Sequence, residues 1–244
     1  MMKNSDKMIL GETGEPIAID NTDRKILYEL DLNGRATYSE IGKKVRLSKQ
    51  AVKERMSRLE KIGIIGQYFA LIDIHRMGYT FYRIDLRFQN ITEEKEKWII
   101  NYILKLPKVI SVLELHGKYD LAVLFLTKDI IETDNNIRNI KWKFNKYIKD
   151  SIFSVVTTHT RYKYGFLIGR KQEDKEVFMG RELADIKLSP VENKVLSALG
   201  WEGRLPLTAL ASKLGKSISS VKNAIKNLKD EKILLGYTTL IATQ

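Results

Sequence analysis

The chain of 244 residues contains no cysteine. This absence excludes disulfides, cysteine-based zinc sites, iron–sulfur clusters and thiol catalysis, and it suits a reducing compartment. No uninterrupted run of about 18 apolar residues occurs, and residues 1–16 lack the apolar core of a signal peptide. The expectation is a soluble, cytoplasmic protein without a membrane-spanning segment.

Groups that carry catalysis are also missing. The sequence shows no glycine-rich phosphate loop, no metal-ligand cluster and no nucleophile–base pair, so no catalytic residue, metal or cofactor is predicted. Positive charge, in contrast, is abundant: 42 Lys and Arg against 30 Asp and Glu give a net charge of +12. Such an excess favours a polyanionic partner, either nucleic acid or an anionic membrane surface.

The sequence contains an internal repeat. Residues 20–72 align without a gap to residues 189–241 at an offset of 169 positions, so that Ser48 falls on Ser217. Of the 53 aligned pairs 14 are identical, where about three are expected by chance. Because a repeat of this length implies a repeated fold, both ends of the chain are expected to form the same module.

Each copy has the pattern of a helix-turn-helix. In the first copy helices are predicted over 22–32, from a capping box at Thr37 to residue 45, and from Ser48 to about residue 61. An apolar hairpin, or wing, is predicted at 63–72, and the second copy repeats this plan with its wing at 233–241. A third helix of this kind fits the DNA major groove.

Between the copies, alternating and helical periods predict the order βαββαβ, with Gly117 in a tight hairpin. This is the ferredoxin-like sandwich, which leaves one sheet face open and favours a homodimer. The predicted fold class is therefore α+β. The predicted domains are a winged helix-turn-helix at 17–72, a ferredoxin-like effector and dimerisation domain at 73–165, a linker at 166–187 and a second winged helix-turn-helix at 188–244.

Up to about residue 165 the sequence resembles the Lrp/AsnC, or feast/famine, family of prokaryotic transcription regulators. The residues that carry the resemblance are Ile19-Asp-Asn-Thr-Asp23, Asn33-Gly-Arg35, Leu47-Ser48, Arg58-Leu-Glu-Lys-Ile-Gly63 and Gly117-Lys-Tyr-Asp120. The chain departs from the family at Arg46, where a glycine is usual, and in its additional C-terminal helix-turn-helix.

The resemblance implies a homodimer or higher homo-oligomer that binds double-stranded DNA and associates with the nucleoid. It also implies an amino acid or related effector at Gly117, Tyr119 and Asp120. In the first module, bases are predicted to be read by Ser48, Lys49, Gln50 and Lys53, and phosphates by Arg35 and Arg58.

The second module carries a corresponding set of polar and basic residues, and each copy has a net charge of +4. The sequence leaves three roles open for this module: it binds DNA, docks on another protein, or packs against its own chain. The residues predicted for DNA binding are Ser217, Ser219, Ser220, Lys222 and Lys226.

Two other functions use the same scaffold. Some proteins that resemble this family are siroheme decarboxylases, in which His and Arg act on a tetrapyrrole, and this chain has only His75, His116 and His159 to offer. A low-specificity protein that bridges distant DNA segments is the other alternative, since fold does not separate it from a local regulator.

Overall fold

The computed structural model describes residues 19–170, 177–180 and 183–242. The two ends of the predicted domains, 17–18 and 243–244, and parts of the predicted linker, 171–176 and 181–182, lie outside the described residues. The chain forms two compact units. Of the described residues, the first unit comprises 19–73, 160–170, 177 and 188–242, and the second comprises 74–159, 178–180 and 183–187.

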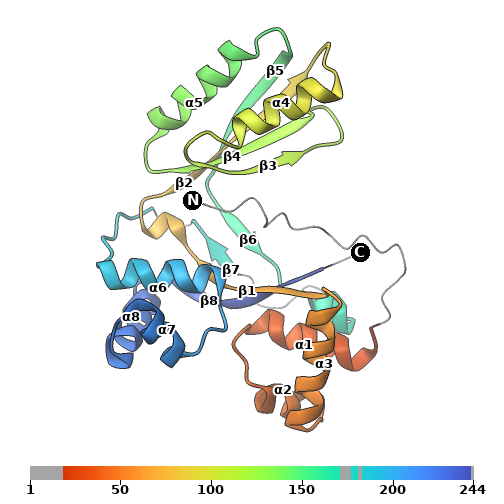
Figure 1. The fold of residues 1–244 in the computed structure, drawn as a ribbon, viewed down its shortest axis with the longest axis vertical. Coiled ribbons are helices and arrows are strands. Elements are labelled where there is room, and N and C mark those ends of the chain that lie inside the picture. The colour runs from red at the N-terminus through yellow and green to blue at the C-terminus, as the bar shows by residue number, and fades with distance from the viewer. Residues whose placement is uncertain (1–18, 171–176, 181–182, 243–244) are drawn as a thin grey trace. The chain divides into compact units, whose positions relative to one another are not determined.

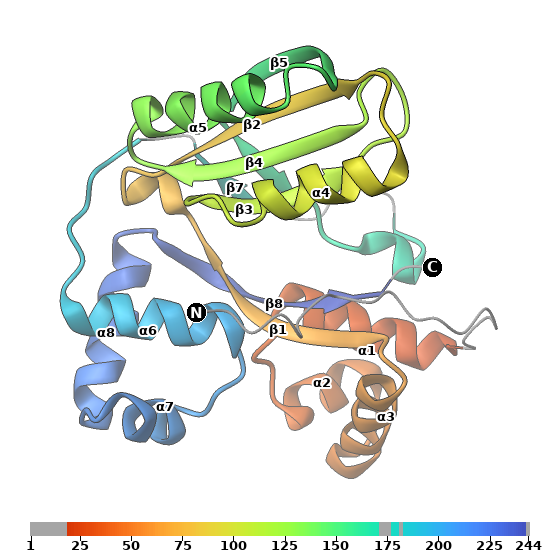
Figure 2. The ribbon, with the colours of Figure 1, turned by 45° about the horizontal axis from the view of Figure 1, so that its top comes forward.

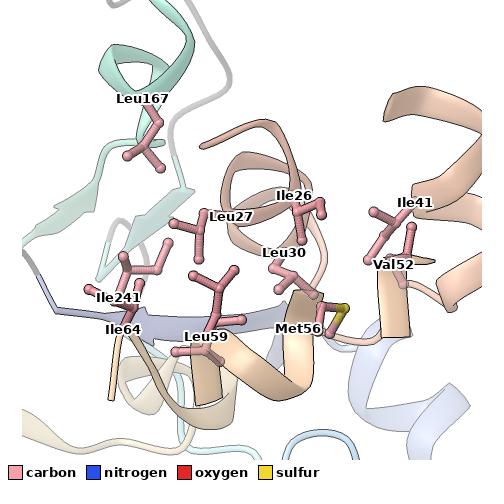
Figure 3. Close-up of a cluster of buried hydrophobic side chains, with 12 residues drawn as sticks. Ile26, Leu27, Leu30, Ile41, Val52, Met56, Leu59, Ile64, Leu167 and Ile241 are labelled. Carbon is pink, nitrogen blue, oxygen red and sulfur yellow. The ribbon is translucent and has the colours of Figure 1, made fainter. Parts of the chain in front are cut away.

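The first helix-turn-helix module follows its sequence signals closely. The side chains of Thr37 and Ser48 accept the backbone N–H groups of Glu40 and Ala51, so both predicted caps are confirmed. The buried core of the module comes from all three helices (Figure 3). Its elements are α1 (Asn21–Leu32), α2 (Tyr38–Val45), α3 (Lys49–Lys61) and the strand β1 (Ile65–Ile72).

The second module repeats this structure. Ser189 forms a capping box with Glu192, Pro190 occupies the first turn of the helix, and Ser217 accepts the N–H of Ser220. Gly215 adopts the left-handed conformation at the end of the second helix, and Arg46 adopts it at the same point of the first module. The elements are α6 (Pro190–Trp201), α7 (Leu207–Leu214), α8 (Ile218–Asp230) and β8 (Leu234–Ile241).

The predicted wings are not hairpins. Each module contributes one strand, and β1 pairs antiparallel with β8 in a two-stranded sheet that runs across both sets of helices (Figures 1 and 2). A single strand exposes unpaired N–H and C=O groups along its edge. Here the strand of each module forms backbone hydrogen bonds with the strand of the other. The two modules, predicted as separate domains, therefore share one unit, and the second packs against its own chain.

Part of the predicted linker also belongs to the first unit. The 3₁₀ turn η2 (Gly165–Ile168) places Leu167 in the core of the first module, where it is 7% exposed (Figure 3). The short strands β6 (His159–Arg161) and β7 (Val177–Met179) lie where the chain passes between the units.

The second unit confirms the ferredoxin-like order. Its sheet is antiparallel, with the strand order β3-β4-β2-β5, and both helices cover one face (Figure 2). Tyr82, Ile84 and Leu86 alternate along the central strand toward this face and pack with both helices. The elements are η1 (Ile74–Arg76), β2 (Thr80–Phe88), α4 (Glu93–Ile103), β3 (Val109–Glu114), β4 (Leu121–Thr127), α5 (Ile130–Lys143) and β5 (Ile148–Val156).

The predicted end of the second helix of this unit, residue 148, is wrong. The helix α5 ends at Lys143, with Phe144 as its C-cap, and Ile148 already belongs to β5. The apolar residues at helical spacing continued past the helix because Phe144 and Ile148 face the same core from the connection and the strand. The spacing of these buried residues thus resembled that of a helix, although they lie beyond its end.

Candidate nucleic-acid interface

The residues predicted to read bases lie together at the N-terminal part of α3. Ser48, Lys49, Gln50 and Lys53 are exposed, whereas Val52 on the opposite face of the helix is completely buried. The Gln50 amide donates a hydrogen bond of 2.8 Å to Glu54 one turn later. The N-terminal residues of a recognition helix are those that reach base edges in helix-turn-helix proteins.

The helix α8 presents a related but different surface. Ser217, Ser219, Lys222 and Lys226 are exposed, and Ser220 is half-buried. Where α3 has Lys49, α8 has Ile218, whose exposed fraction is 49%. The predicted residues of both modules are thus accessible, and their contacts with DNA stay a prediction.

An ion-pair cluster joins α3 to the start of α1. Arg58 pairs with Asp23, which is 1% exposed, and Arg55 lies 2.6 Å from Asp20 and 2.9 Å from Asp23. The backbone N–H of Asp23, together with the Arg55 guanidinium, lowers the pKa of Asp20. These pairs orient Arg58, which is half-exposed, while its predicted contact with a DNA phosphate stays a prediction.

Arg35 lies at the junction of the two modules. Its guanidinium donates a hydrogen bond of 2.8 Å to the carbonyl of Leu205 and lies 4.9 Å from the ring centre of Tyr237. Arg204 makes the corresponding contacts from the other side, with the Ala36 carbonyl at 3.0 Å and the Tyr68 ring at 5.0 Å. Arg35 therefore has a packing role that the sequence interpretation missed, and its predicted phosphate contact stays untested.

A signal for this junction was present in the repeat. Gly34, Arg35 and Tyr68 are identical in the second copy, as Gly203, Arg204 and Tyr237, and all lie where β1 and β8 meet. Burial raises the pKa of both Tyr68 and Tyr237, and a hydrogen bond to Glu60 adds to the effect at Tyr68. Residues that are identical in the two copies therefore include those through which the copies contact each other.

The predicted effector turn is tied to the central strand of the sandwich. The Asp120 carboxylate accepts the backbone N–H of Phe88 at 2.6 Å, and the Asp120 N–H donates to Leu86 at 2.9 Å. Gly117 has φ +154° with open space around its Cα, and Tyr119 is half-buried under the Lys118 ammonium at 5.4 Å. Asp120 thus has a structural role, while Gly117 is exposed and Tyr119 is partly exposed.

Comparisons with known proteins agree with this organisation. The AsnC-type helix-turn-helix domain matches residues 19–60, and a winged helix-turn-helix DNA-binding domain matches residues 188–234. An HTH-type transcriptional regulator of Pyrococcus furiosus is 32% identical over 130 residues, which are 53% of this chain and 84% of that protein. The chain belongs to the Lrp/AsnC family of transcriptional regulators.

Solved structures show which parts of this Lrp/AsnC protein have known folds. An AsnC-family regulator from Agrobacterium tumefaciens matches with a TM-score of 0.50 and 23% identity over 60% of this chain and 95% of its own. The siroheme decarboxylase NirDL matches with a TM-score of 0.60 and 15% identity over 91% of this chain and 65% of its own. At these identities the likenesses establish the fold alone.

The histidines needed by the decarboxylase alternative lie in unlike surroundings. His75 is 3% exposed and packs edge-on against Phe81, whereas His116 and His159 are exposed. Over residues 19–170, 177–180 and 183–242, no three His, Asp or Glu side chains are grouped to hold a metal ion. Within the same ranges no helix has the length and apolarity to cross a membrane.

Proposed function

We propose that this regulator binds double-stranded DNA at specific sequences through the exposed N-terminal part of α3. The observation that carries the proposal is the capped, exposed start of this helix, where Lys49, Gln50 and Lys53 lie on one face. Gln can pair with adenine through two hydrogen bonds, and Lys with guanine or phosphate. We expect the protein to bind chromosomal DNA in the cytoplasm.

Genome-wide occupancy followed by gel shifts tests this proposal. Gln50→Ala is expected to change the preferred sequence at one position, since a good base contact contributes about 1–3 kcal/mol. Lys53→Ala is expected to weaken binding to all sequences. The matched control is Lys141→Ala, an exposed lysine of the second unit on α5. Absence of promoter preference in the wild type would contradict the proposal.

The open sheet face of the sandwich supports a homodimer. Leu113 and Ile152 lie on the face opposite the helices, with exposed fractions of 47% and 46%. Apolar residues of this kind are covered most economically by a second copy of the same sheet. Ile152→Asp should shift the mass measured by sedimentation to that of one chain, whereas the helix-face variant Lys141→Ala should not.

We assign a small-molecule effector, an amino acid or a related metabolite, to the turn at Gly117 and Tyr119. The support is the accessibility of the turn and its firm attachment to β2 through Asp120. Calorimetric titration with the standard amino acids tests the assignment, and Tyr119→Ala should abolish any heat of binding. A signal that survives this substitution places the ligand elsewhere.

A tetrapyrrole-binding enzyme is the second candidate, because the likeness to NirDL extends over 91% of the chain. Titration with siroheme while the absorption spectrum is recorded separates the two functions. A spectral change that disappears in His75→Ala would favour the enzyme. DNA bridging of low specificity is tested in the same gel shifts, since it requires steep salt dependence with little sequence preference.

A further inference from the structure

The pairing of β1 with β8 follows the internal repeat. Phe69 lies directly opposite Thr238, which is its own equivalent in the second copy. Tyr68 pairs with Thr239, and Ala70 pairs with Tyr237, so exchanging the copies reproduces the same pairs. The register irregularities at the two ends of the ladder are exchanged in the same way. This relation defines a local two-fold axis through the Phe69–Thr238 pair.

Hydrogen bonds around the ladder obey the same symmetry. The Gly34 N–H donates to the Tyr237 carbonyl at 2.8 Å, and the Gly203 N–H donates to the Tyr68 carbonyl at 2.7 Å. Beyond the ends of the strands, Asp73 donates to Ile233 at 2.8 Å and Ala242 donates to Ile64 at 3.0 Å, all between backbone atoms.

The glycines of the junction permit this close approach. A Cβ at Gly34 would lie 2.6 Å from the Thr238 carbonyl oxygen, and one at Gly203 would lie 2.7 Å from the Phe69 nitrogen. The backbone contacts of the two glycines and the contacts of Arg35 and Arg204 thus recur reciprocally between the modules. In homodimers such an arrangement is called isologous, and here it is built within one chain.

A two-fold axis between the modules also relates α3 to α8. Dimeric helix-turn-helix proteins place symmetry-related recognition helices on two half-sites in inverted orientation. The present chain has both helices, but their exposed faces differ: Lys49 and Gln50 of α3 correspond to Ile218 and Ser219 of α8. Ser48 and Lys53 are kept, as Ser217 and Lys222.

We infer that one chain binds one DNA site composed of two inverted and unequal half-sites, the first read by α3 and the second by α8. Ile218 suits contact with a thymine methyl group, whereas Gln50 suits adenine. Lys53 and Lys222 supply equivalent backbone or base contacts in both halves. The inference rests on the proposed function of DNA binding by α3.

Selection of binding sequences from a random DNA library, with the full-length protein, tests the inference. The wild type should select a motif with two inverted halves of different sequence at one fixed spacing. The double substitution Ile218→Lys with Ser219→Gln gives α8 the face of α3, and it should convert the motif into a palindrome of the first half. Lys49→Ile with Gln50→Ser should give a palindrome of the second half.

Footprinting supplies a second measurement. Lys222→Ala should lose protection at the second half-site only, and Lys53→Ala at the first only. Each variant should reduce the slope of log affinity against log salt by about 0.9. These side chains are exposed, so unchanged melting curves are expected and verify that each variant is folded.

The outcomes separate this inference from the proposed function. No selected motif at all would overturn both. A single half-site, or two halves in direct orientation, would overturn the inference and leave DNA binding by α3 intact. A palindrome already selected by the wild type would also overturn it, because two copies of α3 from two chains would then read the site. A second half unaffected by the Ile218 and Ser219 substitutions has the same consequence.

Discussion

The two helix-turn-helix modules share their helix lengths and capping but differ in what has been kept between them. Several residues at their junction are the same, as in Gly34 and Gly203 or Arg35 and Arg204. At the exposed start of the third helix two residues differ, Lys49 and Gln50 against Ile218 and Ser219, while Ser48 and Lys53 are kept. Identity within a repeat can thus mark contacts between the copies, while two of the differences fall on the surface proposed to read DNA.

A second difference lies in buried polar groups. Asp31 is fully buried in the first module, where it pairs with Arg161 and accepts the Tyr164 N–H at 2.8 Å. Arg161 also donates to the Thr238 hydroxyl at 2.9 Å. The second module has Gly200 at the position of Asp31 and has no such cluster there among the described residues. The segment that follows the sandwich is thus held by a buried ion pair to the first module and by a hydrogen bond to β8 of the second.

The largest effect is expected when the buried Asp31–Arg161 ion pair is removed. Asp31→Ala leaves the Arg161 charge buried without its partner, and we expect a loss of about 3–5 kcal/mol in the free energy of unfolding. Urea denaturation measures it. The matched control is Glu202→Ala, which removes the exposed Lys213–Glu202 pair of the second module and should cost less than about 1 kcal/mol. Equal losses in both variants would show that the buried cluster adds nothing.

The junction itself is tested by adding one methyl group. Gly34→Ala and Gly203→Ala each force a Cβ against the opposite backbone, so each should destabilise the first unit by about 1–3 kcal/mol. Gly236→Ala on β8 is the control, because its Cβ would meet nothing within 4 Å. Thermal unfolding compares the variants. If Gly34→Ala lowers the melting temperature and Gly203→Ala does not, the two halves of the junction do not contribute equally to stability.

The caps of the recognition helices sharpen the comparison at a smaller scale. Ser48→Ala and Ser217→Ala each remove a hydrogen bond of 3.1 Å to a first-turn N–H, and each should cost about 1 kcal/mol. The double variant should show the sum of the two within about 0.5 kcal/mol, since distant sites are additive. Chemical denaturation of the three variants checks this, and a clear departure from additivity would reveal coupling between α3 and α8.

The smallest expected effect concerns pH. The first module begins α1 with Asp20, whose pKa is lowered by the Asp23 N–H and Arg55, whereas the second module has Ser189 there. Because the pKa of Asp20 is lower in the folded protein, its ionised carboxylate stabilises the folded state at pH values above the ordinary pKa of 3.8. This stabilisation is lost as the pH falls through the lowered pKa. Asp20→Ser should therefore flatten the acid side of a plot of melting temperature against pH. Ser217→Ala should lower the whole curve without changing its slope.

Much of the fold was predictable because its signals are local. Thr37 with Glu40, and Ser48 before an apolar stripe, set the starts of α2 and α3, and alternating residues from Thr80 onward set β2. The end of α5 was not predictable in this way, since Phe144 and Ile148 are buried at helical spacing although the helix has already ended. Buried residues in a connection carry the same pattern as a helix face.

The candidate site likewise contains features that local sequence signals predict and features that they do not. Exposure of Lys49, Gln50 and Lys53 follows from the helical period, because their neighbours Val52 and Met56 must face the core. The contacts of Arg35 and Arg58 did not follow, because their partners Leu205 and Asp23 are remote along the chain. A basic residue near a recognition helix has the same sequence signature whether it faces a phosphate or a carboxylate.

The sequence by itself determined two helix-turn-helix modules and a sandwich between them, since caps and periods act over a few residues and the repeat shows that the second module has the pattern of the first. Only the tertiary structure decided that the wings are single strands and that β1 completes its hydrogen bonds with β8. The physical reason is that an unpaired strand edge must find a partner, and the pattern of apolar residues does not say which strand that partner is.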